Sequence, residues 1–131
     1  MNEFVNPTTI GAPAAAYSLG VVSSADSLWL HTSGIVATLP DGTIPDTVTE
    51  QAAVIWHAIG EICAASGFTI ADIVSYTTYV VQGEDLSIVM AARDAALVGH
   101  AAASTLIVVP ALARPQWRME IAAIAARTST A

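Results

Sequence analysis

The sequence predicts a single α+β domain built from two layers. Three observations lead to this prediction: a length of 131 residues, an apolar composition, and an alternation of strand-like and helix-like segments. A usual domain size of about 100–200 residues leaves room for one domain over residues 1–131. Hydrophobic residues make up 54% of the chain and charged residues 11%, which excludes a disordered protein because disordered chains show the opposite balance.

The expected elements follow the order β-β-α-β-α-β-β. Segments rich in β-branched and aromatic residues predict the strands, which cover residues 17–22, 28–33, 73–81, 104–109 and 117–126. Before them, Pro7 and the Gly11-Ala12-Pro13 stretch predict an extended segment. Helices on one side of a mostly β chain are typical of a two-layer α+β sandwich.

Helix-start and helix-stop residues delimit both expected helices. The first helix begins near Pro45-Asp46 or at Thr47, where Glu50 follows three residues later in a capping-box arrangement. Apolar residues then recur at helical spacing until Gly67, which ends the helix. Asp85 caps the second helix, expected over residues 86–98.

The charge balance excludes several classes of function. The net charge is −7, and all four basic residues are arginines. The lack of lysine excludes Schiff-base lysine chemistry and the P-loop. So few cations argue against a nucleic-acid partner, because phosphate binding needs clustered Lys and Arg. The charged fraction is less than half the usual ~25%, and an apolar surface of this kind is typical of subunit interfaces, so we expect an oligomer.

The location is expected to be cytoplasmic. Cys63 is the single cysteine, so an intrachain disulfide is excluded and a reducing compartment fits. The first residues, Met1-Asn2-Glu3-Phe4, lack the basic and apolar regions of a signal peptide. No apolar run approaches the ~18 residues of a membrane span, so we expect no membrane partner.

The histidines and the cysteine give no sign of a metal or a covalent mechanism. His31, His57 and His100 lie far apart, without the spacing of metal ligands, so each is expected to have a structural or surface role. His31 is the most interesting, because Ser33 shares its strand face. Cys63 lies in an apolar stripe and is expected to be a small buried hydrophobe. No glycine-rich dinucleotide motif follows a strand, so no cofactor is expected.

An acidic residue in the last expected strand is the clearest candidate for chemistry. Arg118 and Glu120 are two residues apart, so they project from one face at a spacing of about 7 Å. A carboxylate in an apolar strand is costly to bury unless it is paired or used. The pattern alone favours an Arg118–Glu120 surface pair over a catalytic role.

Short motifs along residues 11–131 resemble a known family. The matching pieces are Ala12-Pro13 with Tyr17, Thr32-Ser33-Gly34, Asp41-Gly42 with Pro45, Gln51-Ala52, Ala64-Ala65-Ser66-Gly67, Asp72-Ile73-Val74, Leu112-Ala113-Arg114-Pro115 and Met119-Glu120-Ile121-Ala122-Ala123-Ile124-Ala125. In this order and spacing the chain resembles the Rid (reactive intermediate deaminase, YjgF-type) family. The resemblance implies a chorismate-mutase-like fold and a homotrimer with active clefts at its three subunit interfaces. It also implies hydrolysis of small enamines or imines to a carbonyl compound and ammonia.

The resemblance also implies roles for individual residues. Glu120 matches the carboxylate that directs the attacking water. Tyr17 matches a phenol that reaches into the cleft, and Thr105 matches a residue whose backbone N–H contacts the polarised atom.

The sequence departs from the family pattern at the substrate-binding end. Ala103 stands where family members have an arginine that clamps the substrate carboxylate. Met90 stands where the family often has an asparagine, and Ala58 is a third departure. We expect Ser33 and His31 to line the cleft beside these positions, with Arg118 or Arg114 as a replacement for the clamp.

Three functions stay open at this point. The first is a hydrolase or deaminase for a less anionic enamine, imine or related metabolite. The second is a non-catalytic trimer that binds a small molecule or a partner protein. The third is a tailoring enzyme of a specialised pathway that uses the same cleft for cyclisation, isomerisation or a carbon–carbon step.

Overall fold

The computed structural model describes residues 2–128 and confirms the predicted α+β class. Over this range the elements are β1 (Glu3–Val5), β2 (Gly20–Val22), β3 (Ser27–His31), α1 (Val48–Ala65), the 3₁₀ turn η1 (Ile70–Asp72), β4 (Ile73–Val81), α2 (Leu86–Leu97), β5 (Ala103–Val109) and β6 (Met119–Thr128). Neither helix of this range is both long and apolar enough to cross a membrane.

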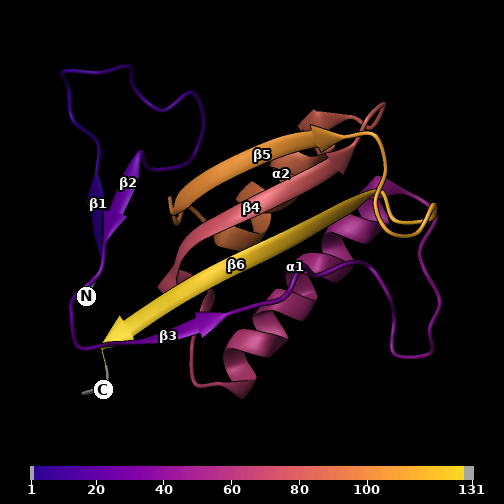
Figure 1. Cartoon of the computed structure of the whole chain (residues 1–131), viewed down its shortest axis with the longest axis horizontal. Coiled ribbons are helices and arrows are strands. Elements are labelled where there is room, and N and C mark those ends of the chain that lie inside the picture. Colours follow the sequence, from indigo (N-terminus) through magenta and orange to yellow (C-terminus); the bar gives the residue numbers. More distant parts are fainter. Residues whose placement is uncertain (1, 129–131) are drawn as a thin grey trace.

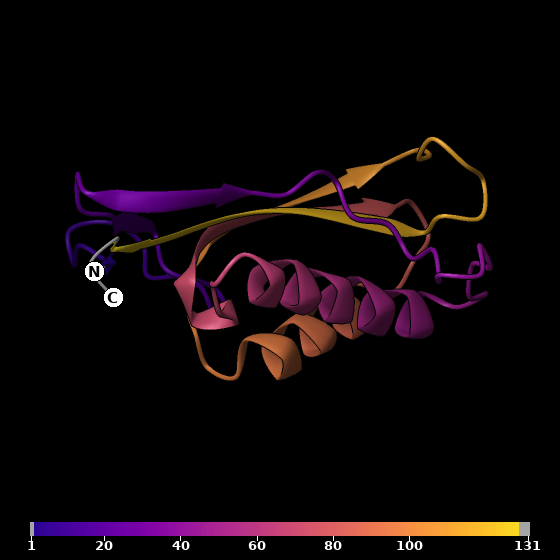
Figure 2. The ribbon, with the colours of Figure 1, turned by 90° about the horizontal axis from the view of Figure 1, so that it is seen from below.

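The two expected layers are a sheet and a pair of helices. The main sheet has the strand order β3-β6-β4-β5, in which β4 and β5 run parallel and the other neighbours antiparallel (Figure 1). Helix α2 makes the crossover that a parallel pair requires. Both helices lie against one face of the sheet and leave the other face uncovered (Figure 2). We call this second face the open face.

Capping residues begin the helices where the sequence predicts. The Thr47 side chain accepts a hydrogen bond from the Glu50 backbone N–H and donates one to the Glu50 carboxylate. Asp85 accepts from the Ser87 backbone N–H at the start of α2. This helix ends at Leu97, one residue before the predicted end, because Val98 adopts a left-handed conformation with φ 48°.

The core lies between the sheet and α1. Along β6 the residues Met119, Ile121 and Ala123 are buried on the helix side, and Ile55 and Ile59 of α1 are buried in the same cluster. Side chains alternate between the two faces of a strand. Glu120 therefore projects from the open face, as its position between two buried residues predicts.

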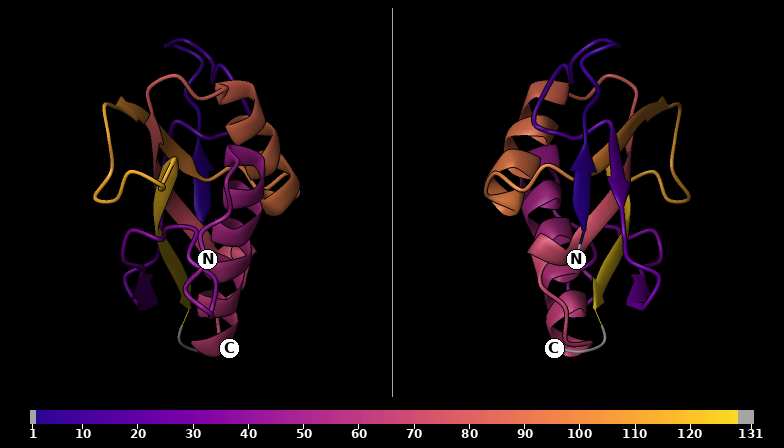
Figure 3. Two further views of the ribbon diagram at one scale, coloured as in Figure 1. Left: turned by 90° about the vertical axis from the view of Figure 1, so that its right-hand side faces the viewer. Right: turned by 90° about the vertical axis from the view of Figure 1, so that its left-hand side faces the viewer.

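One strand is missing from the predicted order. β1 pairs antiparallel with β2 in a two-stranded ribbon that lies at one end of the main sheet (Figure 3). Three residues are too few to show an alternating pattern, and the predicted extended segment begins only after them, at Pro7. The 3₁₀ turn η1 was not predicted either, and the other seven elements occur in the predicted order.

The boundaries of three predicted strands were wrong by a few residues. The strand expected to begin at Tyr17 begins at Gly20, because the Tyr17 N–H turns back to the carbonyl of Ala15. β3 ends at His31 rather than at Ser33, since the Thr32 hydroxyl replaces a backbone carbonyl as acceptor for the Ala123 N–H. The last strand begins at Met119 and extends to Thr128, with Trp117 left in a turn.

Candidate functional site

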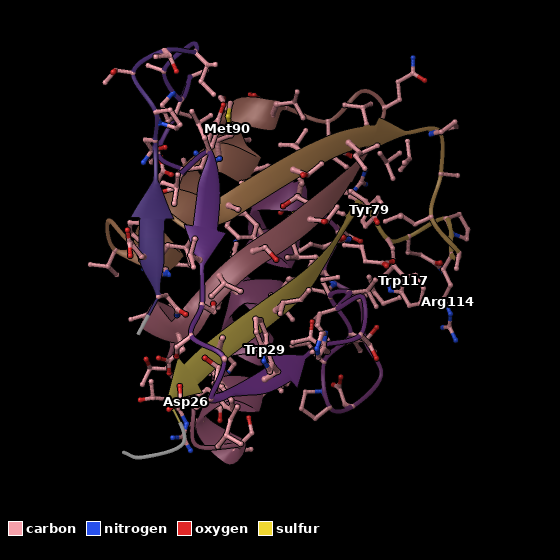
Figure 4. All side chains as sticks on the ribbon, turned by 60° about the vertical axis from the view of Figure 1, so that its left-hand side comes forward. Asp26, Trp29, Tyr79, Met90, Arg114 and Trp117 are labelled. Carbon is pink, nitrogen blue, oxygen red and sulfur yellow. The ribbon has the colours of Figure 1, made fainter. Side chains whose placement is uncertain are left out.

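The Glu120 side chain lies half-buried on the open face of the sheet. Its strand neighbour on β4 is Tyr79, which Figure 4 labels on that strand. The carboxyl group lies directly against Gly34. A Cβ atom added at Gly34 would stand 2.7 Å from the carboxyl carbon of Glu120 and closer still to its Oε2. Only a residue without a side chain fits beside the carboxylate in this position.

Backbone pairing brings Gly34 to Glu120. The Ile35 N–H donates to the carbonyl of Ile121 at 2.7 Å, and the Ile121 N–H donates back to Ile35 at 3.0 Å. This pair of hydrogen bonds fixes the segment after β3 against β6. The main-chain pairing therefore places Gly34 beside the Glu120 carboxyl group. We call Glu120 and Gly34 the acid end of the site.

A cavity of about 440 Å³ lies where β4 and β5 begin. The predicted site residues Tyr17, Ala103 and Thr105 all line it, so the structure brings these three together. The other lining residues are Ser18, Leu19, Ser75, Tyr76, Thr77 and Ser104. We call this space the hydroxyl cavity, because seven of its nine lining residues bear a hydroxyl group.

The segment from Tyr17 to Leu19 closes one side of the hydroxyl cavity. Ser18 forms an isolated parallel bridge with Ala103, and its N–H donates to the carbonyl of Ala102 at 3.2 Å. The Leu19 N–H donates to Asn6 Oδ1 at 2.8 Å. These contacts place the segment as a short extension of the sheet beside the start of β5.

The hydroxyl cavity has no charged side chain among the residues that line it. The hydroxyls of two lining residues, Ser18 Oγ and Tyr76 OH, are buried rather than open to the cavity, and neither has a hydrogen-bond partner within residues 2–128. The Tyr17 hydroxyl accepts from the Ala14 N–H at 3.2 Å. A ligand in this space would meet hydroxyl donors and acceptors rather than a fixed charge.

The acid end and the hydroxyl cavity occupy separate parts of the open face. Thr105 is aligned with Thr77 on β4, whereas Glu120 is aligned with Tyr79, two residues further along that strand. Strand β4 therefore lies between them, and two strand spacings amount to about 10 Å. Glu120 is not among the residues that line the hydroxyl cavity.

The arginines proposed as replacement clamps lie outside the hydroxyl cavity. Arg118 Nη1 is 2.7 Å from Glu84 Oε1, and its Nε donates to the carbonyl of Asp46. The expected Arg118–Glu120 pair is therefore wrong: Arg118 precedes the strand and is bound to Glu84 instead. The Arg114 guanidinium lies over the Trp117 ring at 5.3 Å, and Figure 4 shows both residues in the loop before β6.

The remaining predicted site residues are scattered. Met90 lies on α2 and does not line the hydroxyl cavity. His31 is exposed on the edge strand β3, where its ring stacks with Trp29 at a centroid distance of 6.5 Å. Ser33 is exposed next to Gly34 in the segment after that strand. Of these three, Ser33 alone adjoins the acid end in sequence.

Sequence reasoning missed three residues of the site. Gly34 was noted only as part of the Thr32-Ser33-Gly34 motif, and its contact with Glu120 depends on a pairing between distant segments. Ser18 follows a predicted site residue directly, so its neighbour Tyr17 was an available signal. Tyr76 lies in a segment whose composition indicated only a strand.

The other reactive side chains fit structural roles. Cys63 is buried. Its burial, and to a smaller extent the negative charge of the nearby Asp72 carboxylate, raise the pKa of the Cys63 thiol. A raised pKa disfavours the nucleophilic thiolate. His57 Nε2 lies 3.4 Å from Glu61 Oε1 on the exposed face of α1, which agrees with the expected surface role. Within residues 2–128, no three His, Cys, Asp or Glu side chains gather as a metal site requires.

A second cavity, of about 400 Å³, lies between β1, η1 and the end of β6. It contains none of the predicted site residues. The Arg127 guanidinium that lines it lies over the Phe68 ring at 5.2 Å and donates to the carbonyl of Thr128. The His100 Nε2 lies 2.6 Å from the carbonyl of Ile73. Because these polar groups join neighbouring elements, we assign this cavity a structural role.

Comparisons with known proteins agree with this arrangement. The sequence model described as endoribonuclease L-PSP matches residues 9–127. A Rid-family protein from Yersinia pestis is 28% identical, with a TM-score of 0.85 over 96% of this chain and 98% of that chain. TdcF from E. coli, solved with bound serine, is 26% identical, with a TM-score of 0.70 over 94% of each chain.

A more distant structure supports the fold alone. RidA from an Antarctic Psychrobacter species is 21% identical, with a TM-score of 0.68 over 94% of this chain and 98% of that chain. No curated protein matches the sequence. The helix-covered sheet is the chorismate-mutase-like fold that these proteins share. On the match over residues 9–127, the chain belongs to the endoribonuclease L-PSP family, which is also called the YjgF or Rid family.

Proposed function

We propose that this protein hydrolyses a small enamine or imine to a carbonyl compound and ammonia, with water directed by Glu120. Family membership supports imine or enamine deamination, or a related small-molecule function. The observation on which the specific proposal rests is the Glu120 carboxylate held against Gly34 on the open face. A fixed carboxylate in this place can accept a proton from water as a general base.

The proposed reaction needs only water as a co-reactant. Glu120 accepts a proton while the water oxygen bonds to the imine carbon, and the electrons of the C=N π bond move to nitrogen, which gains a proton. The resulting carbinolamine loses ammonia as the C–N bond breaks and the C=O bond forms. Tyr17 and the backbone N–H of Thr105 are proposed to hold the substrate in the hydroxyl cavity.

We further propose that the working unit is a homotrimer whose clefts combine two subunits. The acid end and the hydroxyl cavity lie on opposite sides of β4, so a small molecule does not reach both within one chain. The open face also exposes large apolar side chains, with Trp29 50% and Ile107 39% exposed. Exposed apolar surface of this kind favours association, and a neighbouring subunit can bring its acid end to this chain's hydroxyl cavity.

The family description names ribonuclease activity, whereas we propose a small-molecule substrate. The hydroxyl cavity offers no cation to a phosphate group, and phosphate contacts dominate nucleic-acid binding. The absence of a nucleic-acid partner and the cytoplasmic location stay predictions. Degradation of single-stranded RNA by the wild type, lost in Glu120→Gln, would favour the ribonuclease instead.

The first test compares wild type with Glu120→Gln on a panel of neutral and carboxylate-bearing imines, with ammonia release as the measurement. Removing a general base is expected to lower kcat by about 10²–10⁴-fold. Glu61→Gln is the matched control, because this exposed carboxylate lies on α1 and pairs with the equally exposed His57. Equal turnover by wild type and Glu120→Gln would remove Glu120 from the mechanism. No turnover by wild type would favour the non-catalytic binding protein.

The shared cleft is tested by subunit mixing. Ala103→Trp fills the hydroxyl cavity, and Glu120→Gln removes the base, so each variant alone is expected to be inactive. Trimers refolded from both variants contain clefts with an intact cavity from one subunit and an intact carboxylate from its neighbour, so activity should return. A light-scattering mass of three times 13.5 kDa is expected for each protein. A monomeric mass or no recovery in mixed trimers would contradict the shared cleft.

A further inference from the structure

Glu120 stands in a cross-strand row of bulky side chains on the open face. Its partner on β4 is Tyr79, and the partner of Tyr79 on β5 is Ile107; Figure 4 labels Tyr79 on its strand. Side chains directly opposite each other on neighbouring strands lie on the same face, with Cβ atoms about 5 Å apart. Tyr79 is half-buried and Ile107 is 39% exposed. The side of Glu120 toward β4 is therefore bordered by aromatic and aliphatic surface.

The next row of the open face, two residues further along β6, has small side chains. Ala122 is half-buried and stands opposite Thr77 on β4. On its other side it stands opposite Gly34, because the bridge between Ile35 and Ile121 sets an antiparallel register. Between β4 and the segment after β3, this row therefore carries only the methyl group of Ala122.

The Glu120 carboxyl group leans toward the row of small side chains. It lies where a side chain of Gly34 would begin, on the side of β6 that is away from Tyr79. Two strand spacings, about 10 Å, separate the backbones of Gly34 and Tyr79. Ala122 and the stem of Glu120 form the surface between them. We call this surface the step, because it rises from Ala122 to Tyr79.

The step suits an apolar group better than a charged one. Arg118, the nearest basic residue in the sequence, is bound to Glu84 and to the Asp46 carbonyl. A charged substituent would therefore lose its hydration without gaining a counter-ion, and the Glu120 carboxylate would repel an anion. An apolar group instead removes the surface of Tyr79 from water, and a flat one can pack against its ring in a stacked or edge-on geometry.

We propose that Tyr79 and Ala122 determine the substrate specificity of the proposed reaction, by admitting a flat apolar substituent, such as an aryl group, on the carbon that water attacks. The substituent packs against the Tyr79 ring, and the small Ala122 side chain leaves it room beside the carboxylate. In the shared cleft, Tyr79 acts from the same subunit as Glu120. The role in turnover rests on the proposed imine hydrolysis, whereas binding of the carbonyl product does not.

The test uses two ketones that model the product, acetophenone and cyclohexyl methyl ketone, and measures their dissociation constants for the full chain by calorimetry. The two differ only in whether the ring is aromatic and flat. Wild type is expected to bind acetophenone about fivefold more tightly, the value of one aromatic contact of about 1 kcal/mol. Equal binding of the two ketones, or no binding of acetophenone, would overturn the proposal.

Variants at the step separate the ring of Tyr79 from its hydroxyl. Tyr79→Phe keeps the ring and should keep the preference for acetophenone, whereas Tyr79→Leu should abolish that preference. Ala122→Val fills the step and should weaken binding of both ketones about tenfold. Thr49→Ala, on the exposed face of α1, is the control and should change neither constant. A preference for acetophenone that survives in Tyr79→Leu would contradict the role of the ring.

Steady-state kinetics distinguish this specificity from the proton transfer assigned to Glu120. Tyr79→Leu should raise KM for an aryl ketimine about fivefold and leave kcat near the wild-type value, because it removes binding that is equal in the ground and transition states. Glu120→Gln should lower kcat instead. The melting temperature of Tyr79→Leu should stay near that of wild type, since Tyr79 lies outside the core between sheet and helices. A lower melting temperature with an unchanged ketone preference would assign Tyr79 a structural role.

Failure of the specificity and failure of the reaction give different results. A ketone preference that depends on Tyr79, without turnover of any imine, would support the step and contradict the reaction. Imine hydrolysis that requires Glu120, with aryl and saturated ketimines turned over equally by wild type and Tyr79→Leu, would support the reaction and overturn the step. Ketone binding is measured in Glu120→Gln as well, where the preference for acetophenone should persist.

Discussion

The acid end and the hydroxyl cavity lie on the same face of one sheet but are built in opposite ways. At the acid end, paired backbone segments press Gly34 against the Glu120 carboxylate and leave no spare room. In the hydroxyl cavity, about 440 Å³ of space is bordered mainly by side chains that bear a hydroxyl group. The difference indicates that the group proposed to move protons is fixed by the main chain. The choice of the group bound in the cavity is left to the side chains that border the open space.

Among variants that keep the Glu120 carboxylate, the largest expected effect comes from adding one methyl group at the acid end. Gly34→Ala places a Cβ atom where the Glu120 carboxyl group lies, so the carboxyl group must move. Displacing a catalytic group by about 1 Å can cost about 100-fold in rate, and we expect a loss of this size in kcat/KM. The melting temperature should hardly change, because only the end of a flexible side chain has to shift.

Two variants control this measurement. Gly60→Ala, in α1, meets no neighbouring atom within 4 Å and should keep full activity. In a Glu120→Gln background, Gly34→Ala should cause no further loss, because the group that it displaces is already inactive. Full activity in Gly34→Ala would show that the acid end is less tightly constrained than the structure indicates.

A smaller effect is expected from the residue that anchors the start of β6. Gln51 is fully buried; its side-chain N–H groups donate to the carbonyls of Pro45 and Gln116, and its Oε1 accepts from the Arg118 N–H, each at 2.8 Å. Gln51→Ala leaves buried backbone groups without partners and should lower the free energy of unfolding by about 2 kcal/mol. Denaturant titration measures this loss.

The conservative variant Gln51→Glu sharpens the result. It preserves the acceptor for Arg118 but replaces the N–H donors, so a stability loss comparable with that of Gln51→Ala would assign the effect to the two donated bonds. Ser18→Ala in the hydroxyl cavity should leave stability unchanged or raise it. A large loss of stability in Ser18→Ala, together with no loss in Gln51→Ala, would contradict this expectation.

The smallest effect is expected for Arg118. Its pair with Glu84 is partly exposed, with 44% and 19% of the two side chains accessible, and such pairs are worth about 1 kcal/mol or less. Arg118→Gln should therefore reduce stability by less than about 1 kcal/mol and leave kcat/KM near the wild-type value. A double-mutant cycle with Glu84→Gln isolates the pair. A selective loss of activity toward carboxylate-bearing imines would show instead that Arg118 acts as the clamp.

Local signals were enough to predict most of the fold. Thr47 with Glu50, and Asp85, marked the helix starts, and the density of β-branched residues gave β4 with its observed ends. β1 was missed because it has only three residues, and the β2 residues that pair with them lie fifteen or more positions away in the chain. Strand ends were misplaced where a side chain, the Thr32 hydroxyl, interrupted the backbone ladder.

The site was only partly predictable, because its parts meet through long-range pairing. The family resemblance pointed to Tyr17, Ala103 and Thr105, which the structure brings into one cavity. The contact of Gly34 with Glu120 requires the Ile35–Ile121 pairing, which no local pattern encodes. The lack of partners for Ser18 and Tyr76 is a property of the surrounding packing and has no signature in the sequence.

The bridge between Ser18 and Ala103 has a consequence for how the protein could admit its ligand. Residues 17–19 are joined to β5 by this single bridge, whereas β5 itself is held to β4 along its full length. Residues 17–19 can thus move away from β5 with the loss of very few hydrogen bonds, while the main sheet stays intact. The backbone amide hydrogens of residues 17–19 should exchange with solvent much faster than those of β4. A ligand bound in the hydroxyl cavity should selectively slow the exchange of residues 17–19.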